Sequence, residues 1–215
     1  MQSKAVLFDM DGVIVNSERY WVETEQTDIL PSAVSGSADT SETTGMNFRE
    51  IYDYLEARHE MTASKDEFVA RYEEAARDIY GEKVDLQANF RDLVADLRAE
   101  GRTVALVSSS PHDWISRMLD RFDLRESFDR VISAEEIDAK SKPEPDVYEY
   151  AAEQVGVAPE ACIAVEDSEN GVESAERAGM RVVGYRNQSD ERLDLSAADA
   201  VAESPEELRS ILLGE

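Results

Sequence analysis

The sequence is short of the residues that build disulfides and membrane segments. Cys162 is the only cysteine among 215 residues, so no disulfide can form within the chain. It lies in the apolar run Ala161–Val165, where a small buried side chain is expected rather than a reactive thiol. No apolar run approaches the eighteen or so residues of a transmembrane helix. The run Ala5–Phe8 is too short for a signal-peptide core and is followed by Asp9. We therefore expect a cytoplasmic protein.

Basic residues are also scarce. The chain has 22 Lys and Arg, only five of them lysine, against 48 Asp and Glu, and its formal net charge is −26. A chain this acidic has no long-range attraction for nucleic acid or an anionic membrane, so neither is expected as a partner. Molar salt shortens the Debye length to about 3 Å and screens such self-repulsion. Because the acidic excess runs along the whole chain, we expect a protein of a halophile's salt-rich cytoplasm. The alternative is an ordinary acidic, soluble protein.

Short apolar runs alternate with stretches of helical spacing. The hydrophobic fraction of 42% is that of a folded globular protein. Between the runs, apolar residues recur at intervals of three and four, as the helical pattern requires. The runs, which indicate buried strands, are Ala5–Phe8, Thr103–Val107, Arg130–Ile132, Ala161–Val165 and Arg181–Tyr185, with a weaker one at Ala198–Val201. This alternation predicts a doubly wound α/β fold with a parallel sheet, whose functional residues follow the strands.

Residues 16–84 interrupt this alternation. They contain no convincing strand and three helical patterns, near 18–30, 47–57 and 64–80. Residues 31–45 are rich in Ser, Thr, Gly and Ala, which indicates a loop. We therefore predict an α/β core formed by residues 1–15 and 85–215. An all-helical cap, residues 16–84, is inserted after the first strand and covers the active site.

Polar side chains follow the first two predicted strands. Asp9 and Asp11 come after the first, where buried carboxylates are costly unless a cation such as Mg²⁺ neutralises them. Such aspartates also occur in turns and caps. Ser108, Ser109 and Ser110 follow the second strand, where hydroxyls and backbone amides can hold phosphate oxygens. Since a proline follows Ser110, that serine is expected to cap the next helix while Ser108 binds phosphate.

The next two strand ends carry a lysine and a second pair of acids. Lys142 follows the third strand on a proline-stiffened loop, and can neutralise both a carboxylate and a phosphate. Glu166 and Asp167 follow the fourth strand. Taken singly, Lys142 could be a solvated surface lysine, and Asp167 or Ser168 a helix cap. The four strand ends together carry an acid pair, a hydroxyl, a lysine and a second acid pair, and this combination instead favours one phosphoryl-transfer site.

Four segments resemble, in order and spacing, the four motifs of the haloacid dehalogenase superfamily: Phe8–Val13, Val107–Ser108, Lys142–Pro145 and Glu166–Gly171. The resemblance covers residues 4–190. The helical insertion is similar to the cap of the subgroup that contains phosphoglycolate phosphatase and β-phosphoglucomutase. The resemblance implies a Rossmann-like core and a Mg²⁺-dependent phosphatase for a small phosphorylated metabolite, of the sugar phosphate or phosphoglycolate type.

The resemblance also implies a role for each site residue. Asp9 would be the nucleophile that forms a transient aspartyl-phosphate, and Asp11 the acid that protonates the leaving oxygen and then activates water. The phosphoryl oxygens would be held by Ser108, Ser109 and Lys142. The magnesium ion would be bound by Asp9, the Asp11 carbonyl, Asp167 and Glu166, the last as a ligand or as a partner of one. Substrate choice would depend on the cap residues Glu18, Trp21, Asn47 and Arg49.

Three alternatives are weighed against a phosphatase. Dehalogenases of the superfamily lack the second aspartate of the first motif, so Asp11 makes dehalogenation unfavoured. β-Phosphoglucomutase carries a cap histidine where this chain has Trp21, which favours hydrolysis over a mutase. A non-catalytic binding protein would be expected to have lost a nucleophile or metal ligand, and none is missing. Trp21 could equally lie in the core of the cap, and Arg49 could pair with Glu50 or Asp53. The sequence indicates no oligomeric state.

Overall fold

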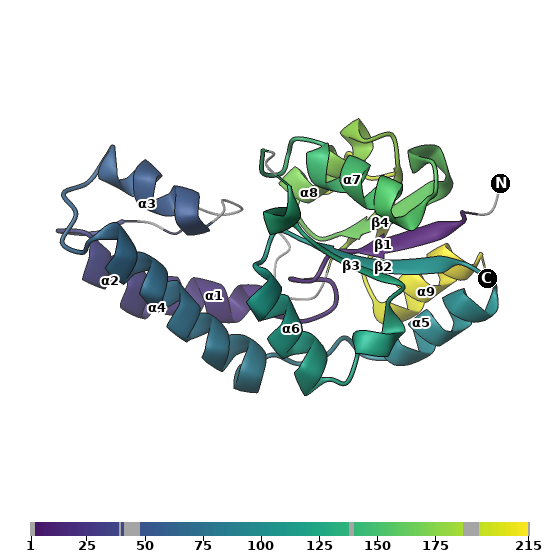
Figure 1. Cartoon of the computed structure of the whole chain (residues 1–215), viewed down its shortest axis with the longest axis horizontal. Coiled ribbons are helices and arrows are strands. Elements are labelled where there is room, and N and C mark those ends of the chain that lie inside the picture. Colours follow the sequence, from purple (N-terminus) through teal and green to yellow (C-terminus); the bar gives the residue numbers. More distant parts are fainter. Residues whose placement is uncertain (1–2, 39, 41–47, 138–139, 187–193, 215) are drawn as a thin grey trace. The chain divides into compact units, whose positions relative to one another are not determined.

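The computed structural model in Figure 1 describes residues 3–38, 40, 48–137, 140–186 and 194–214. The chain divides into two compact units. One comprises residues 1–16 and 85–215 and contains the sheet, and the other comprises residues 17–84 and is helical. Within the ranges described, no helix is long and apolar enough to cross a membrane.

The sheet has six parallel strands in the order β3-β2-β1-β4-β5-β6. Their bounds are β1 Ala5–Phe8, β2 Thr103–Ser108, β3 Arg130–Ser133, β4 Cys162–Glu166, β5 Arg181–Tyr185 and β6 Ala200–Ala202. The predicted doubly wound α/β class is confirmed, and each predicted strand is present to within two residues. The chain adds strands outward from β1 on one side and from β4 on the other. The switch point therefore lies between these two strands, where such sheets bind ligands.

Helices cover both faces of the sheet, with α7 and α8 on one face and α5, α6 and α9 on the other (Figure 1). Side chains of β1 alternate between the two layers, as the period-two geometry of a strand requires. Leu7 packs in the core with Tyr148 and Val172, whereas the Phe8 ring meets Phe90 edge-on at 5.3 Å. The bounds are α5 Phe90–Ala99, α6 His112–Arg121, α7 Asp146–Val155, α8 Glu169–Arg177 and α9 Pro205–Leu213. Short 3₁₀ helices occur at Arg125–Ser127, Ala134–Glu136 and Pro159–Ala161.

The helical unit contains the three predicted helices, but the first is not continuous. Its elements are α1 Glu18–Thr24, a π-helical turn at Glu25–Ile29, α2 Leu30–Ala33, α3 Phe48–Glu56, α4 Lys65–Asp78 and a second π-turn at Ile79–Lys83. The Leu30 amide bonds to the Glu25 carbonyl, five residues back, which widens the helix there. The helix α2 includes residues 31–33, which the sequence pattern assigned to a loop over residues 31–45.

The interior of the helical unit is aromatic. Tyr72 lies at its centre, with the rings of Phe68 at 5.0 Å, Phe48 at 5.4 Å and Trp21 at 5.6 Å. The start of α4 is fixed by a capping box, in which Ser64 accepts from the Glu67 amide and Glu67 accepts from the Ser64 amide. This unit thus has its own core and its own helix-end signals.

Candidate active site

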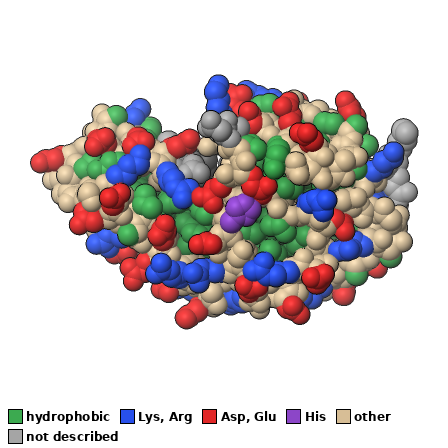
Figure 2. All heavy atoms as spheres, viewed as in Figure 1, with side chains coloured by type: hydrophobic (Ala, Val, Ile, Leu, Met, Phe, Trp, Pro, Cys, Tyr) green, Lys and Arg blue, Asp and Glu red, His purple; other side chains and the backbone are tan. Residues whose placement is uncertain are grey.

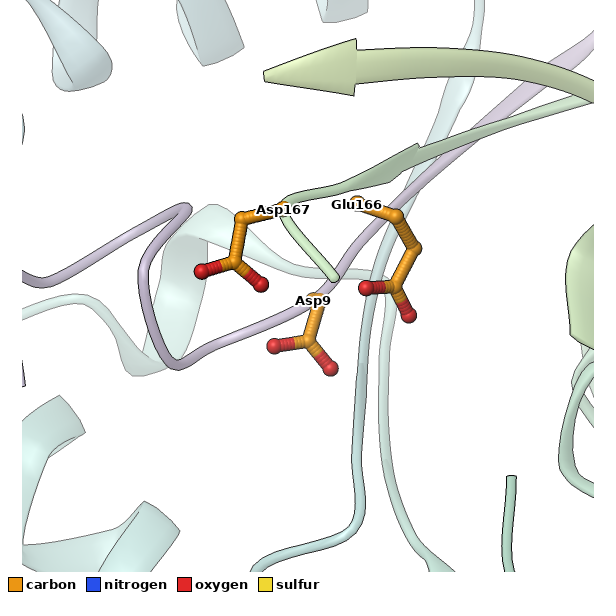
Figure 3. A group of neighbouring side chains, drawn as sticks. All are labelled: Asp9, Glu166 and Asp167. Atoms are coloured by element: carbon orange, nitrogen blue, oxygen red, sulfur yellow. The ribbon is translucent and has the colours of Figure 1, made fainter. Parts of the chain in front are cut away.

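Three carboxylates converge at the switch point of the sheet, where Figure 3 shows Asp9, Glu166 and Asp167 together. Asp9 directly follows β1, and its amide donates to the Val165 carbonyl of β4 over 3.0 Å. Glu166 ends β4 and Asp167 follows it. One oxygen from each carboxylate lies within 4.8 Å of the other two. Such a group of oxygens is suited to bind a divalent cation.

The carboxylates of Asp167 and Glu166 occupy space that a side chain at position 12 or 171 would fill, and both of these positions are glycine. A β-carbon added at Gly12 would lie 1.6 Å from an Asp167 carboxylate oxygen, and one added at Gly171 would lie 2.1 Å from the Glu166 carboxyl. Gly12 also has a φ of +75°, which disfavours other residues. Both glycines fall inside segments that the sequence singled out, but only the fold shows what each one accommodates.

Lys142 lies among the acids. Its ammonium donates to Asp9 Oδ1 over 2.7 Å and to Glu166 Oε1 over 2.6 Å, and its side chain is 8% exposed. The buried Tyr148 hydroxyl donates to the same Glu166 oxygen over 2.5 Å, and its ring centroid lies 5.1 Å from Lys142 Nζ. Sequence reasoning missed Tyr148. Helical periodicity placed this residue in the core of α7 but gave no sign of its hydroxyl's partner.

The site carries an excess of negative charge. Burial raises the pKa of Asp9 well above its ordinary value, the Lys142 charge opposes this, and Glu166 and Asp11 raise it further. Burial alone would lower the pKa of Lys142, but Asp9 and Glu166 outweigh it and raise that pKa, so Lys142 is an ammonium. One ammonium cannot neutralise the Asp9, Glu166 and Asp167 carboxylates. The residues therefore fit a Mg²⁺ ion, which binds through oxygen ligands.

The serines after β2 are arranged differently from the prediction. Ser108 ends β2 and is buried, and its Oγ accepts from the Ser110 amide over 3.0 Å. The half-buried Ser109 lies between them. The prediction that Ser110 caps the next helix is wrong, because α6 has Pro111 at its N-cap position and no side-chain cap. The Ser110 hydroxyl instead donates to Asp11 Oδ2 over 2.9 Å.

The strand ends of the sheet thus bring Asp9, Asp11, Ser108, Lys142, Glu166 and Asp167 to one edge. Of the weighed alternatives, a capping role is found at Ser168, which accepts from the Gly171 amide over 3.1 Å. A surface position for Lys142 is excluded by its burial. Buried acids, an ammonium and a hydroxyl at one switch point define an α/β enzyme equipped for phosphoryl transfer.

The residues expected to select substrate belong to the helical unit. Trp21 is half-buried; it donates to the Tyr80 hydroxyl over 3.1 Å and stacks on Tyr72 at 5.6 Å, both within that unit. Arg49 lies over the Phe48 ring at 4.7 Å. Asp53, one of its two expected partners, is paired with Lys65 at 2.6 Å. The predicted residues also include Glu18, which is exposed at the start of α1, and Asn47, which lies outside the described residues.

A sequence profile of haloacid dehalogenase-like hydrolases matches residues 6–185, so the chain belongs to this family. Hexitol phosphatase B of Escherichia coli K12 is 36% identical over 186 residues, covering 85% of this chain and 83% of the relative. A phosphorylated carbohydrates phosphatase of Thermotoga maritima is 28% identical over 212 residues, with 97% and 98% covered. The crystal structure of a putative β-phosphoglucomutase from Thermotoga maritima has a TM-score of 0.75 at 28% identity, with 100% and 99% covered. The chain is a phosphoric monoester hydrolase of this family.

Proposed function

We propose that the chain is a Mg²⁺-dependent phosphatase that hydrolyses a phosphorylated sugar or sugar alcohol through an aspartyl-phosphate on Asp9. The observation that carries the proposal is the contact of Asp9 with Lys142 beside Glu166 and Asp167. A carboxylate held by an ammonium, next to a further pair of acids, has both a fixed direction of attack and a place for a cation.

The chemistry takes two steps. An Asp9 oxygen forms a bond to phosphorus while the ester P–O bond breaks, and the departing oxygen takes a proton from Asp11. Water then gives a proton to Asp11 and attacks the same phosphorus, which releases inorganic phosphate and restores Asp9. Lys142 holds Asp9 in line and offers positive charge to the phosphoryl oxygens, to which Ser108 donates its hydroxyl. Asp9, Asp167 and the Asp11 carbonyl would hold a Mg²⁺ ion, with Glu166 as a further ligand or as a partner of one, and the ion would supply further charge neutralisation.

The relatives that cover most of the chain support this substrate class. Both curated relatives above are named for activity on phosphorylated hexitols or carbohydrates. Phosphoglycolate remains in the proposal as a smaller alternative substrate, since phosphoglycolate phosphatase of Escherichia coli is 32% identical over 135 residues. A sugar phosphomutase is the second candidate, favoured by the similarity to the β-phosphoglucomutase structure. Trp21, where the mutases have histidine, counts against it.

We further propose that residues 17–84 act as the cap that selects the substrate, and that the protein works in a salt-rich cytoplasm. The first rests on the position of this unit between β1 and the rest of the core sequence. The second rests on the net charge of −26. Figure 2 shows the acidic side chains spread over the visible surface rather than gathered in one patch.

Purified protein should be assayed against a panel of sugar, sugar-alcohol and short organic phosphates, with Mg²⁺ or with EDTA, at low and molar KCl. We expect Mg²⁺-dependent phosphate release from at least one sugar or sugar-alcohol phosphate. Asp9→Asn should fold and be inactive. Failure to hydrolyse any member of the panel would refute the proposal, and isomerisation faster than phosphate release would favour the mutase.

A further inference from the structure

Ser110 lies beside Asp11 at the active site, and the proposed mechanism gives it no part in the reaction. It is 9% exposed, and its hydroxyl donates to Asp11 Oδ2 over 2.9 Å. A serine at the N-cap, directly before a helix, ordinarily accepts from an amide of the first turn, but the N-cap of α6 is Pro111 and Ser110 lies one residue further back. Here α6 has no side-chain cap, and the hydroxyl is turned to a carboxylate that follows a different strand. We infer that Ser110 is a positioning residue that sets the orientation of the Asp11 carboxyl for proton transfer.

The backbone of Ser110 is held from two sides, which is what a positioning residue requires. Its amide donates to Ser108 Oγ over 3.0 Å, and its carbonyl accepts from Ser133 Oγ over 2.8 Å. Both of these serines are buried, and they end the adjacent strands β2 and β3. The orientation of Asp11 is thus tied to the rigid sheet rather than to its own turn.

This hydrogen bond distinguishes the two oxygens of Asp11. Oδ2 accepts the Ser110 hydrogen, so in the protonated acid the transferable proton resides on Oδ1. In the first step, the ester P–O bond breaks as the bond from Asp9 forms, and the departing oxygen takes the proton from Asp11 Oδ1. Fixing the carboxyl plane places that proton in one direction, and general acid catalysis depends on this geometry. The inference rests on the proposed function of Asp11 as the acid.

The experiment compares leaving groups. An alkyl phosphate releases a basic oxygen that needs the proton, whereas p-nitrophenyl phosphate releases a weakly basic one that needs it far less. The measured quantity is the ratio of kcat/KM for the alkyl ester to kcat/KM for the aryl ester. Ser110→Ala should lower this ratio about tenfold, a part of the 10²–10⁴-fold that a general acid contributes. In an Asp11→Asn background, Ser110→Ala should lower it no further.

A matched control is Ser204→Ala, which removes a hydroxyl that accepts from the Glu207 amide at the start of α9. This variant loses a helix cap and some stability, and its ratio should equal that of the wild type. An unchanged ratio in Ser110→Ala, with the ratio lowered in Asp11→Asn, would overturn the role of Ser110 and leave the proposed function intact. An unchanged ratio in Asp11→Asn would instead refute Asp11 as the acid. Equal losses on both esters in Ser110→Ala would show direct substrate contact and also overturn the inference.

Discussion

Lys142 donates a hydrogen bond to Asp9 over 2.7 Å, and both side chains are less than a tenth exposed. The two residues are 133 positions apart in the chain, and the doubly wound sheet brings them together. Because the pair is buried, the contact gains from the low local dielectric, and loss of Lys142 would leave the Asp9 charge without this partner. The same ammonium contacts Glu166, so one lysine fixes the nucleophile and a candidate metal ligand at once.

The hydroxyl of Tyr148 should matter to activity as well as to stability. Tyr148→Phe keeps the ring but leaves Glu166 without one of its donors, which costs about 1–3 kcal/mol for a buried acceptor. We expect a lower melting temperature and about tenfold lower kcat/KM. The control is Tyr150→Phe on the same helix, which removes a hydroxyl bonded to Glu136 at an exposed site. Equal behaviour of the two variants would contradict the role assigned to Tyr148.

Gly12→Ala should abolish activity. The new β-carbon would fall 1.6 Å from an Asp167 oxygen, so the carboxylate must leave its position. Gly156→Ala is a matched control, because its φ of +69° is similar and nothing lies within 4 Å of the added carbon. Both variants carry the backbone cost of a left-handed alanine, about 1 kcal/mol. Only Gly12→Ala should lose hydrolysis in the assay, and a comparable loss in Gly156→Ala would assign the effect to backbone strain.

The helical unit contains a half-buried acid, Glu25, whose effect on stability depends on pH. Burial raises the pKa of Glu25, although a hydrogen bond from Tyr72 over 2.9 Å lowers it in part. The stability this confers is present below the pKa of the unfolded chain, about 4.3, and is lost as the pH rises through the folded value. Glu25→Gln keeps an acceptor for Tyr72 without the charge. It should therefore unfold at higher temperature than the wild type at pH 7, with the difference shrinking at pH 4.

Glu23→Gln controls for the removal of one negative charge from an acidic chain, because Glu23 is exposed in the preceding turn. The gain at pH 7 should be larger for Glu25→Gln than for Glu23→Gln. Equal gains would mean that general charge repulsion, rather than burial of Glu25, accounts for the result.

Salt should stabilise the fold. With a net charge of −26, repulsion between exposed carboxylates acts over about 10 Å in 0.1 M salt and over about 3 Å in 1 M salt. The melting temperature should therefore rise as KCl increases from low to molar concentration, as measured by circular dichroism. Greatest stability in dilute buffer would contradict the adaptation to salt.

Much of the fold could be read from the sequence because buried parallel strands appear as short apolar runs. The ends of those runs also predicted that Asp9, Lys142 and Glu166 lie at one edge of the sheet. What could not be read were contacts between distant elements. Tyr148 has the period of a core residue, and Ser110 the position of a helix cap, yet their hydroxyls point to Glu166 and Asp11. Apolar periodicity indicates which face of an element a residue lies on. It does not indicate which polar atom on a distant element will bond to its side chain.

The π-turn at Glu25–Ile29 shows the same limit within one element. Apolar spacing predicted one helix over residues 18–30, because a single widened turn changes the pattern by only one position. The turn was therefore not visible in the sequence.

The central claim is that Asp9 carries the phosphoryl group. Asp11→Asn should slow its discharge to water, whereas formation of the aspartyl-phosphate from p-nitrophenyl phosphate needs little help from an acid. This variant can therefore be mixed with Mg²⁺ and p-nitrophenyl phosphate, quenched in acid and mapped by peptide mass spectrometry. We expect one added phosphoryl group on the peptide that contains Asp9, removable by hydroxylamine and absent when Asp9→Asn is added to the variant. A phosphoryl group on any other residue, or none while the same substrate is being hydrolysed, would contradict it.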